Sequence, residues 1–196
     1  MEAVQGRGRL AAALLLAAFG AAAVSTASGA TPVEDPAHSS ALQLGVSGSP
    51  FADEISVSLD GTQTQYVVTS TRLINPPPPP CNQISDSQIS CPTSDFVAFE
   101  VHLGKGRDSF TVGPSIRVPV SISGGPGRDL LRGGSGDDTL RGGAGGDRLF
   151  GNNGRDVLRG AKGGDVLTGG KGRDELIGGA GRDALRGGQG RDVEKQ

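Results

Sequence analysis

The C-terminal part of the chain repeats one pattern of apolar, acidic and glycine positions every nine residues. From Gly124 it divides into eight consecutive units: GGPGRDLLR, GGSGDDTLR, GGAGGDRLF, GNNGRDVLR, GAKGGDVLT, GGKGRDELI, GGAGRDALR and GGQGRDVEK. The first seven units have an apolar eighth position between two variable residues, which predicts a very short strand with one inward side chain. This position is Leu in the first seven units: Leu131, Leu140, Leu149, Leu158, Leu167, Leu176 and Leu185.

The first half of each unit predicts a tight turn. Glycine at positions one, two and four permits φ > 0 and close approach of the backbone. One unit cannot bury its leucine alone, but two units back to back form a coil, and stacked coils bury two files of leucines. We therefore predict an all-β fold in which residues 124–196 form a parallel β-roll, a β-solenoid, preceded by an irregular β-strand region.

The sixth position of every unit is aspartate, which places carboxylates at regular intervals along the roll. Alternate units share an edge, and neighbouring coils lie about 4.8 Å apart, so the stacked carboxylates would repel one another unless a cation lay between them. Carboxylate and turn carbonyl oxygens suit Ca²⁺ better than Mg²⁺, which prefers a compact octahedron. One edge holds Asp129, Asp147, Asp165 and Asp183, and the other Asp138, Asp156, Asp174 and Asp192.

The motif G-G-x-G-x-D-x-U-x resembles the calcium-binding nonapeptide of the RTX, or hemolysin-type, proteins. The resemblance is tight over residues 124–192 and loose before them. It implies a parallel β-roll with Ca²⁺ as cofactor between successive turns, held by the eight aspartates and by turn glycines. The glycines implied as metal ligands are Gly125, Gly127, Gly134, Gly136, Gly143, Gly145, Gly154, Gly163, Gly170, Gly172, Gly179 and Gly181.

Several units depart from the motif. Asn152 and Ala161 replace the second glycine; Asn tolerates a left-handed conformation, whereas Ala is strained there. Glu194 takes the last apolar position, so we expect the eighth unit to be a frayed cap and the site of Asp174 and Asp192 to be weakened. A basic scaffold lowers affinity for cations, so we expect weak calcium binding, on the order of 10⁻⁴–10⁻³ M. Arginine occupies the fifth position in five units: Arg128, Arg155, Arg173, Arg182 and Arg191.

Residues 45–123 carry traces of the same repeat. GSPFADEIS at 48–56 has Asp53 at position six, and LGKGRDSFT at 103–111 has Asp108 there. Alternating apolar residues predict further strands around them. We interpret this region as β structure that stacks on the roll and caps it; a separate small β domain is the alternative.

Pro76–Pro80 and two cysteines indicate a loop that leaves these strands. A polyproline run cannot donate hydrogen bonds, which predicts a stiff surface loop, with a ligand for a partner domain as the alternative. Cys81 and Cys91 form the only pair of cysteines in the chain. In an exported protein such a pair predicts a disulfide, and without a nearby histidine it does not favour a zinc site.

The N-terminus has the features of an export signal. Arg7 and Arg9 precede an apolar run from Leu10 to Val24, and small residues at 28–30 favour cleavage after Ala30, with Ala27 as a second candidate. A membrane anchor is the alternative, but the run is shorter than the roughly 20 residues of a span. We predict a signal peptide over 1–30, a linker over 31–44, a secreted mature chain and no membrane span after processing.

The function expected from these features is calcium binding in a structural or adhesive secreted protein, not catalysis. The mature part contains only His38 and His102, and no nucleophile has a recognisable partner spacing. The alternative is a module that binds anionic cell-wall polymers or glycans, in preference to nucleic acid. Its basis would be two sets of arginines: a ladder of Arg155, Arg173 and Arg191, and the position-nine residues Arg132, Arg141, Arg159 and Arg186.

Overall fold

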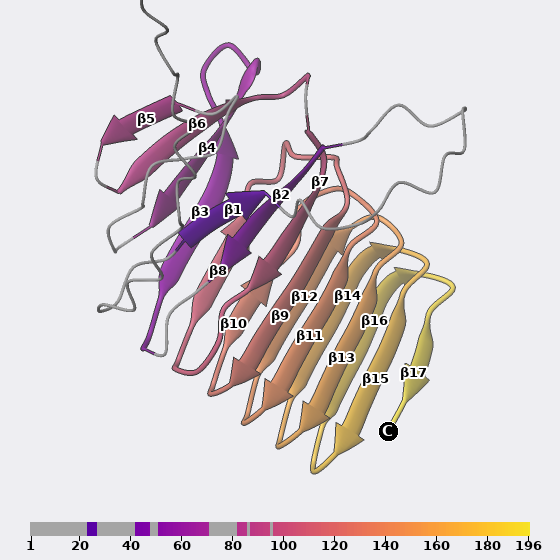
Figure 1. Cartoon of the computed structure of the whole chain (residues 1–196). Helices are drawn as coiled ribbons and strands as arrows, with labels where there is room; N and C mark the ends of the chain where they lie inside the picture. The colour runs from indigo at the N-terminus through magenta and orange to yellow at the C-terminus, as the bar shows by residue number, and fades with distance from the viewer. Residues whose placement is uncertain (1–22, 27–41, 48–50, 71–81, 86, 95) are drawn as a thin grey trace, which may run out of the picture.

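The computed structural model describes residues 23–26, 42–47, 51–70, 82–85, 87–94 and 96–196. The elements in these ranges are all strands, arranged in two facing sheets (Figure 1). We call the eight-stranded sheet, of order β1-β2-β7-β9-β11-β13-β15-β17, sheet 1. The nine-stranded sheet, of order β16-β14-β12-β10-β8-β3-β4-β6-β5, is sheet 2. Within the same ranges there is no helix of the length and apolarity that a membrane span requires.

The bounds of the strands follow their order in each sheet. Sheet 1 contains β1 (Ala23–Thr26), β2 (Leu42–Ser47), β7 (Phe96–His102), β9 (Val120–Pro126), β11 (Thr139–Ala144), β13 (Val157–Lys162), β15 (Glu175–Ala180) and β17 (Val193–Lys195). Sheet 2 contains β16 (Ala184–Gly190), β14 (Val166–Gly172), β12 (Arg148–Asn153), β10 (Leu130–Arg132), β8 (Ser109–Val112), β3 (Glu54–Leu59), β4 (Gln65–Ser70), β6 (Gln88–Pro92) and β5 (Asn82–Ser85).

The chain winds as a parallel β-solenoid of about five turns over residues 99–195. Successive strands alternate between the two sheets, and each pairs in parallel with the strand one coil away. In sheet 1 Leu140 is in register with Leu158, and in sheet 2 Leu149 is in register with Leu167. The predicted all-β parallel roll is confirmed, because equal positions of alternate units stack along each sheet.

The core is a double file of apolar side chains between the sheets. The repeat leucines from Leu131 to Leu176 are completely buried, and Leu185 is partly buried against them. Burial of one such side chain stabilises the fold by about 1.5–3 kcal/mol, so each unit adds one modest increment. Upstream of the repeats Phe99, Val101 and Phe110 continue the files, which compensates for the scarcity of aromatic residues in the repeats.

The turns use the glycine positions in two different ways. At positions two and four φ is positive in most units, as at Gly143 (126°) and Gly145 (144°). The first glycine of each unit has no positive φ and is required for close approach instead, because a Cβ at Gly124 would collide with Asp129 Oδ2 and lie 2.8 Å from the carbonyl oxygen of Gly142. Of the two uses expected for these glycines, position one therefore needs only the close approach.

The region before the repeats extends both sheets. β2 pairs in parallel with β7, and β3 pairs in parallel with β8, where Ile55 is opposite Phe110. Beyond β3 the pairing changes to antiparallel through β4, β6 and β5. This antiparallel extension packs on the roll through Tyr66, whose ring meets that of Phe99 edge to face at 4.9 Å.

Part of the predicted N-terminal organisation lies outside the described residues. This applies to Pro76–Pro80, to Cys81 and to most of the signal peptide and linker. Cys91 is completely buried in β6, and its disulfide with Cys81 stays a prediction. β1 lies inside the predicted signal peptide, and β2 begins at Leu42, within the last three residues of the predicted linker 31–44.

The C-terminal coil lacks a core residue. Glu194, at the position occupied elsewhere by leucine, is exposed, and its Oε1 accepts a hydrogen bond from the backbone N–H of Gly187. A carboxylate cannot replace the leucine between the sheets, and here it instead binds a backbone donor of β16. The roll therefore ends in a polar coil.

Ala161 and Asn152 occupy left-handed turn positions with φ of 87° and 78°. Because the Cβ of alanine is strained there, we predict that Ala161→Gly raises the free energy of unfolding by about 1 kcal/mol. The control Ala180→Gly, at an exposed position without positive φ, should lower it by about 0.5–1 kcal/mol. Equilibrium urea denaturation of both variants checks this, and a loss in both would contradict the assignment of strain to Ala161.

Candidate metal-binding edges

The aspartates form two continuous hydrogen-bonded files, one along each edge of the roll. In each file the Oδ1 atom accepts the backbone N–H of the aspartate one coil earlier; Asp129 N–H donates to Asp147 Oδ1 at 2.9 Å, and Asp147 N–H to Asp165 Oδ1 at 2.8 Å. The first Asp file consists of Asp53, Asp108, Asp129, Asp147, Asp165 and Asp183. The second Asp file consists of Asp138, Asp156, Asp174 and Asp192.

The second carboxylate oxygen of most of these residues has no hydrogen-bond partner. The carboxylates are nevertheless buried, with Asp147 and Asp156 completely inaccessible. A buried carboxylate oxygen without a donor is costly, so these atoms are candidate ligands for a cation. The unpartnered atoms are the Oδ2 atoms of Asp129, Asp147, Asp156, Asp165, Asp174 and Asp183.

Backbone carbonyl oxygens of one coil lie close to the turn glycines of the next coil. The carbonyl oxygen of Gly125 occupies the space that a Cβ on Gly143 would need. The carbonyl oxygen of Gly127 blocks a Cβ on Gly145 in the same manner. The carbonyls of positions two and four therefore point along the roll toward the next coil. A side chain at Gly143 or Gly145 has no room beside these oxygens.

The second unit has a different turn. Neither Gly134 nor Gly136 has positive φ, and Gly134 N–H donates to Asp138 Oδ2 at 2.7 Å, so this carboxylate has donors for both oxygens. The cause is the neighbouring segment 114–118, which is not a repeat turn: a Cβ at Gly134 would lie 2.7 Å from the oxygen of Ile116. Of the glycines predicted as ligands, Gly127, Gly134 and Gly136 lack the left-handed conformation of the others.

Burial makes the carboxylates hard to ionise in the absence of a cation. Desolvation raises the pKa of Asp129 and Asp138 to about 6 and that of Asp156 to about 7, against hydrogen bonds from backbone N–H groups that lower it. The pKa values of Asp147 and Asp165 are raised for the same reason, with a smaller contribution from the next carboxylate in the file. A cation bound beside these carboxylates would stabilise their charged form and lower their pKa values.

The available donors fit a hard cation. Among the residues that the structure describes, no three His, Cys, Asp or Glu side chains gather at one point, so a cation in these gaps would depend on backbone carbonyls as well as aspartates. An oxygen-only set made of turn carbonyls and single carboxylates suits Ca²⁺, which accepts six to eight oxygens in flexible geometry. The residues present fit the ion that the repeat implies.

The arginines are distributed over different surfaces. Arg155, Arg173 and Arg191 accompany the second Asp file, and Arg155 contacts Asp137 of the preceding coil at 3.7 Å. The position-nine arginines do not form one ladder. Arg141 and Arg159 are neighbours on sheet 1, whereas β10 and β16 of sheet 2 carry the other two, Arg132 and Arg186.

One feature of the edges was missed by sequence reasoning. The backbone N–H of one aspartate donates a hydrogen bond to Oδ1 of the aspartate one coil later. Only the register of the parallel strands reveals this contact. The first Asp file also continues into Asp108 and Asp53, where Gly104 and Gly106 have the positive φ of a repeat turn. The sequence signal for this extension was the incomplete repeat at 103–111.

The fold and its edges define the protein's C-terminal region as a parallel β-roll with buried aspartate files. A model of the RTX calcium-binding nonapeptide repeat, built from four copies, matches residues 123–158 and again 159–194. This region is therefore made of hemolysin-type RTX repeats, a class that typically binds Ca²⁺. Comparison with curated proteins and with solved structures finds no match.

The raised pKa values predict an unusual pH dependence for the calcium-free chain. In the unfolded chain these carboxyls titrate near 3.8, whereas in the fold Asp129 and Asp156 titrate near 6 and 7. Between these values the folded state binds more protons, so its stability is highest below about pH 4 and falls as pH rises through about 6–7. Denaturation in calcium-free buffers from pH 4 to 8 should show this decline, and an increase with pH would contradict it.

Proposed function

We propose that this chain is a secreted calcium-binding protein in which Ca²⁺ between successive coils drives folding of the roll. The observation that carries the proposal is the set of buried Oδ2 atoms without a donor, four along the first Asp file and two along the second. Bound calcium would supply the positive charge that these carboxylates lack. We expect the turn carbonyls of positions two and four, which face the next coil, to supply further oxygen ligands.

The chain's own residues explain why the metal-free roll would be unstable. Parallel coils place each carboxylate next to the following one, and one backbone N–H per aspartate satisfies only one of its two oxygens. Glycine-rich turns lose much conformational entropy on folding, and each unit buries only one leucine in return. Metal binding and folding are therefore expected to be one coupled transition.

We infer a structural or adhesive role outside the cell in place of catalysis. The only histidine in the described part, His102, lies exposed on the outer face of β7, where its Nε2 is 3.2 Å from Glu100 Oε1. The acidic residues stand in regular files, which suits repeated metal binding better than a paired acid and base. RTX repeat proteins are generally secreted, and the basic and apolar N-terminus supports the same location.

The decisive variant is Asp147→Asn, which keeps an oxygen acceptor for the Asp129 amide but removes one charge from the first Asp file. Because ligand charge sets calcium affinity, the calcium concentration at the midpoint of folding should rise by about tenfold. In calcium-free buffer the same change removes a buried charge and should stabilise the chain. Circular dichroism during calcium titration, with isothermal calorimetry, measures both effects.

Asp137→Asn is the matched control. It makes the same change of charge at an exposed position beside Arg155, outside the files, and should leave the calcium midpoint within about twofold. Equal shifts in the two variants would mean that general charge, not the file, controls the transition. A parent chain that is equally folded with calcium and with chelator would overturn the proposed function.

Export can be tested separately. If residues 1–30 are a signal peptide, chain recovered from the medium of an expressing bacterium should begin at Thr31, or at Ser28 if the second candidate site is used. Intact-mass measurement and N-terminal sequencing determine this. Recovery of the chain with Met1 still present, in membranes only, would favour the anchor instead.

A further inference from the structure

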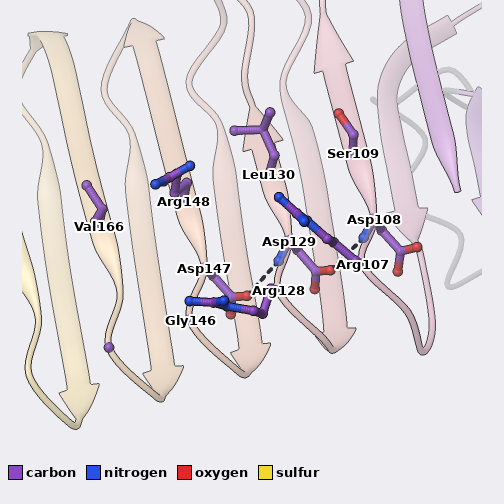
Figure 2. Close-up of a pocket in the computed structure, with 11 residues that line it drawn as sticks. Arg107, Asp108, Ser109, Arg128, Asp129, Leu130, Gly146, Asp147, Arg148 and Val166 are labelled. Atoms are coloured by element: carbon purple, nitrogen blue, oxygen red, sulfur yellow. Dashed lines mark hydrogen bonds between the residues drawn. The ribbon is translucent and has the colours of Figure 1, made fainter. Parts of the chain in front are cut away.

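A groove lies on the edge of the roll where the first Asp file meets the outer face of sheet 2. Three arginines from successive coils stand around it: Arg107 and Arg128 each precede an aspartate of the file, and Arg148 begins β12 (Figure 2). Leu130 and Val166 form its apolar part. We call this recess the arginine groove. It is distinct from the ladder of Arg155, Arg173 and Arg191 on the opposite edge.

The groove exists because the fifth position is glycine in two successive odd-numbered units. Where other units carry arginine, Gly146 and Gly164 leave the edge open. The Arg128 side chain extends over this opening, with Nε 3.6 Å and a terminal guanidinium nitrogen 3.7 Å from the position that a Cβ of Gly146 would take. The sequence variation at position five thus forms a recess lined by guanidinium groups.

These guanidinium groups are exposed and not used in ion pairs. Within the part of the chain that the structure describes, the Lys and Arg ion pairs are Arg155 with Asp137 and Lys195 with Glu175, and neither reaches the groove. Arg132, by contrast, lies over the Phe150 ring at 4.4 Å. The groove arginines therefore retain their hydrogen-bonding capacity for a ligand.

The charge of the groove depends on the Asp file beneath it. Arg107, Arg128 and Arg148 contribute three positive charges, and the file contributes the three carboxylates of Asp108, Asp129 and Asp147, so the formal sum without metal is zero. Each Ca²⁺ at the file would add two positive charges. The groove becomes strongly cationic only in the calcium-loaded roll. This part of the inference rests on the proposed function.

We propose that the arginine groove binds the acidic groups of an anionic polysaccharide, and that it does so in the calcium-loaded protein. Guanidinium groups hold carboxylate and sulfate oxygens through paired N–H donors, which suits such groups better than a neutral sugar. Proteins that bind single-stranded nucleic acid generally stack bases on aromatic side chains, and none lines this groove. The chemistry on this edge therefore favours an acidic glycan over a nucleic acid.

The test compares two triple variants of the full mature chain in saturating calcium. Arg107→Gln/Arg128→Gln/Arg148→Gln removes the groove charges, and Arg155→Gln/Arg173→Gln/Arg191→Gln removes the same charge from the opposite edge. With a heparin hexasaccharide as probe, calorimetry at fixed ionic strength should show at least tenfold weaker binding for the groove variant. The affinity of the ladder variant should stay within about threefold of that of the parent. Its lost charges lie on the opposite edge, where salt screens their electrostatic effect on the groove.

Folding and calcium affinity of each variant are measured separately by circular dichroism and calcium titration. Equal losses in both variants, or no loss in the groove variant, would overturn the proposal. So would a single-stranded oligonucleotide that binds as tightly as the hexasaccharide with the same arginine dependence. If hexasaccharide binding needed the groove arginines but not calcium, only the calcium coupling would be overturned. A parent chain that showed no calcium-dependent folding transition would instead overturn the proposed function.

Discussion

Buried carboxylates one coil apart are the constraint on which the rest of this structure depends. Parallel stacking brings each aspartate next to its counterpart, and the intervening amide satisfies only Oδ1. The remaining Oδ2 atoms are buried and lack donors in most turns. No described side chain donates to these Oδ2 atoms, and this is the reason for our proposal that a cation binds along the edges.

The glycines follow from the same constraint. A first-position side chain would occupy the space of the carboxylate, and side chains at positions two and four would collide with carbonyls of the preceding coil. The glycines at these positions therefore leave room for the carboxylates and for the carbonyls of the neighbouring coil. Asn152 and Ala161 show that a left-handed conformation persists without glycine when the neighbouring coils impose it.

The two edges carry the same aspartates but differ in their surroundings. The first Asp file continues beyond the repeats to Asp53, whereas the second begins at Asp138, whose carboxylate is already satisfied by Gly134. Glycine at position five opens a recess on the first edge, while arginine fills that position along most of the second. A repeat that looks uniform thus produces one edge with an open cationic groove and one with a regular arginine ladder.

The nine-residue period by itself determined the strands, the leucine core and the assignment of aspartates to alternate edges, because each depends only on position within a unit. It also revealed Asp108, since an incomplete repeat keeps its acidic and apolar positions. Contacts between distant coils could be decided only by the tertiary structure. The satisfied carboxylate of Asp138 depends on segment 114–118, the division of the position-nine arginines depends on which sheet each strand joins, and the arginine groove depends on three coils meeting at one edge. These features arise from register and packing between coils, which no single unit encodes.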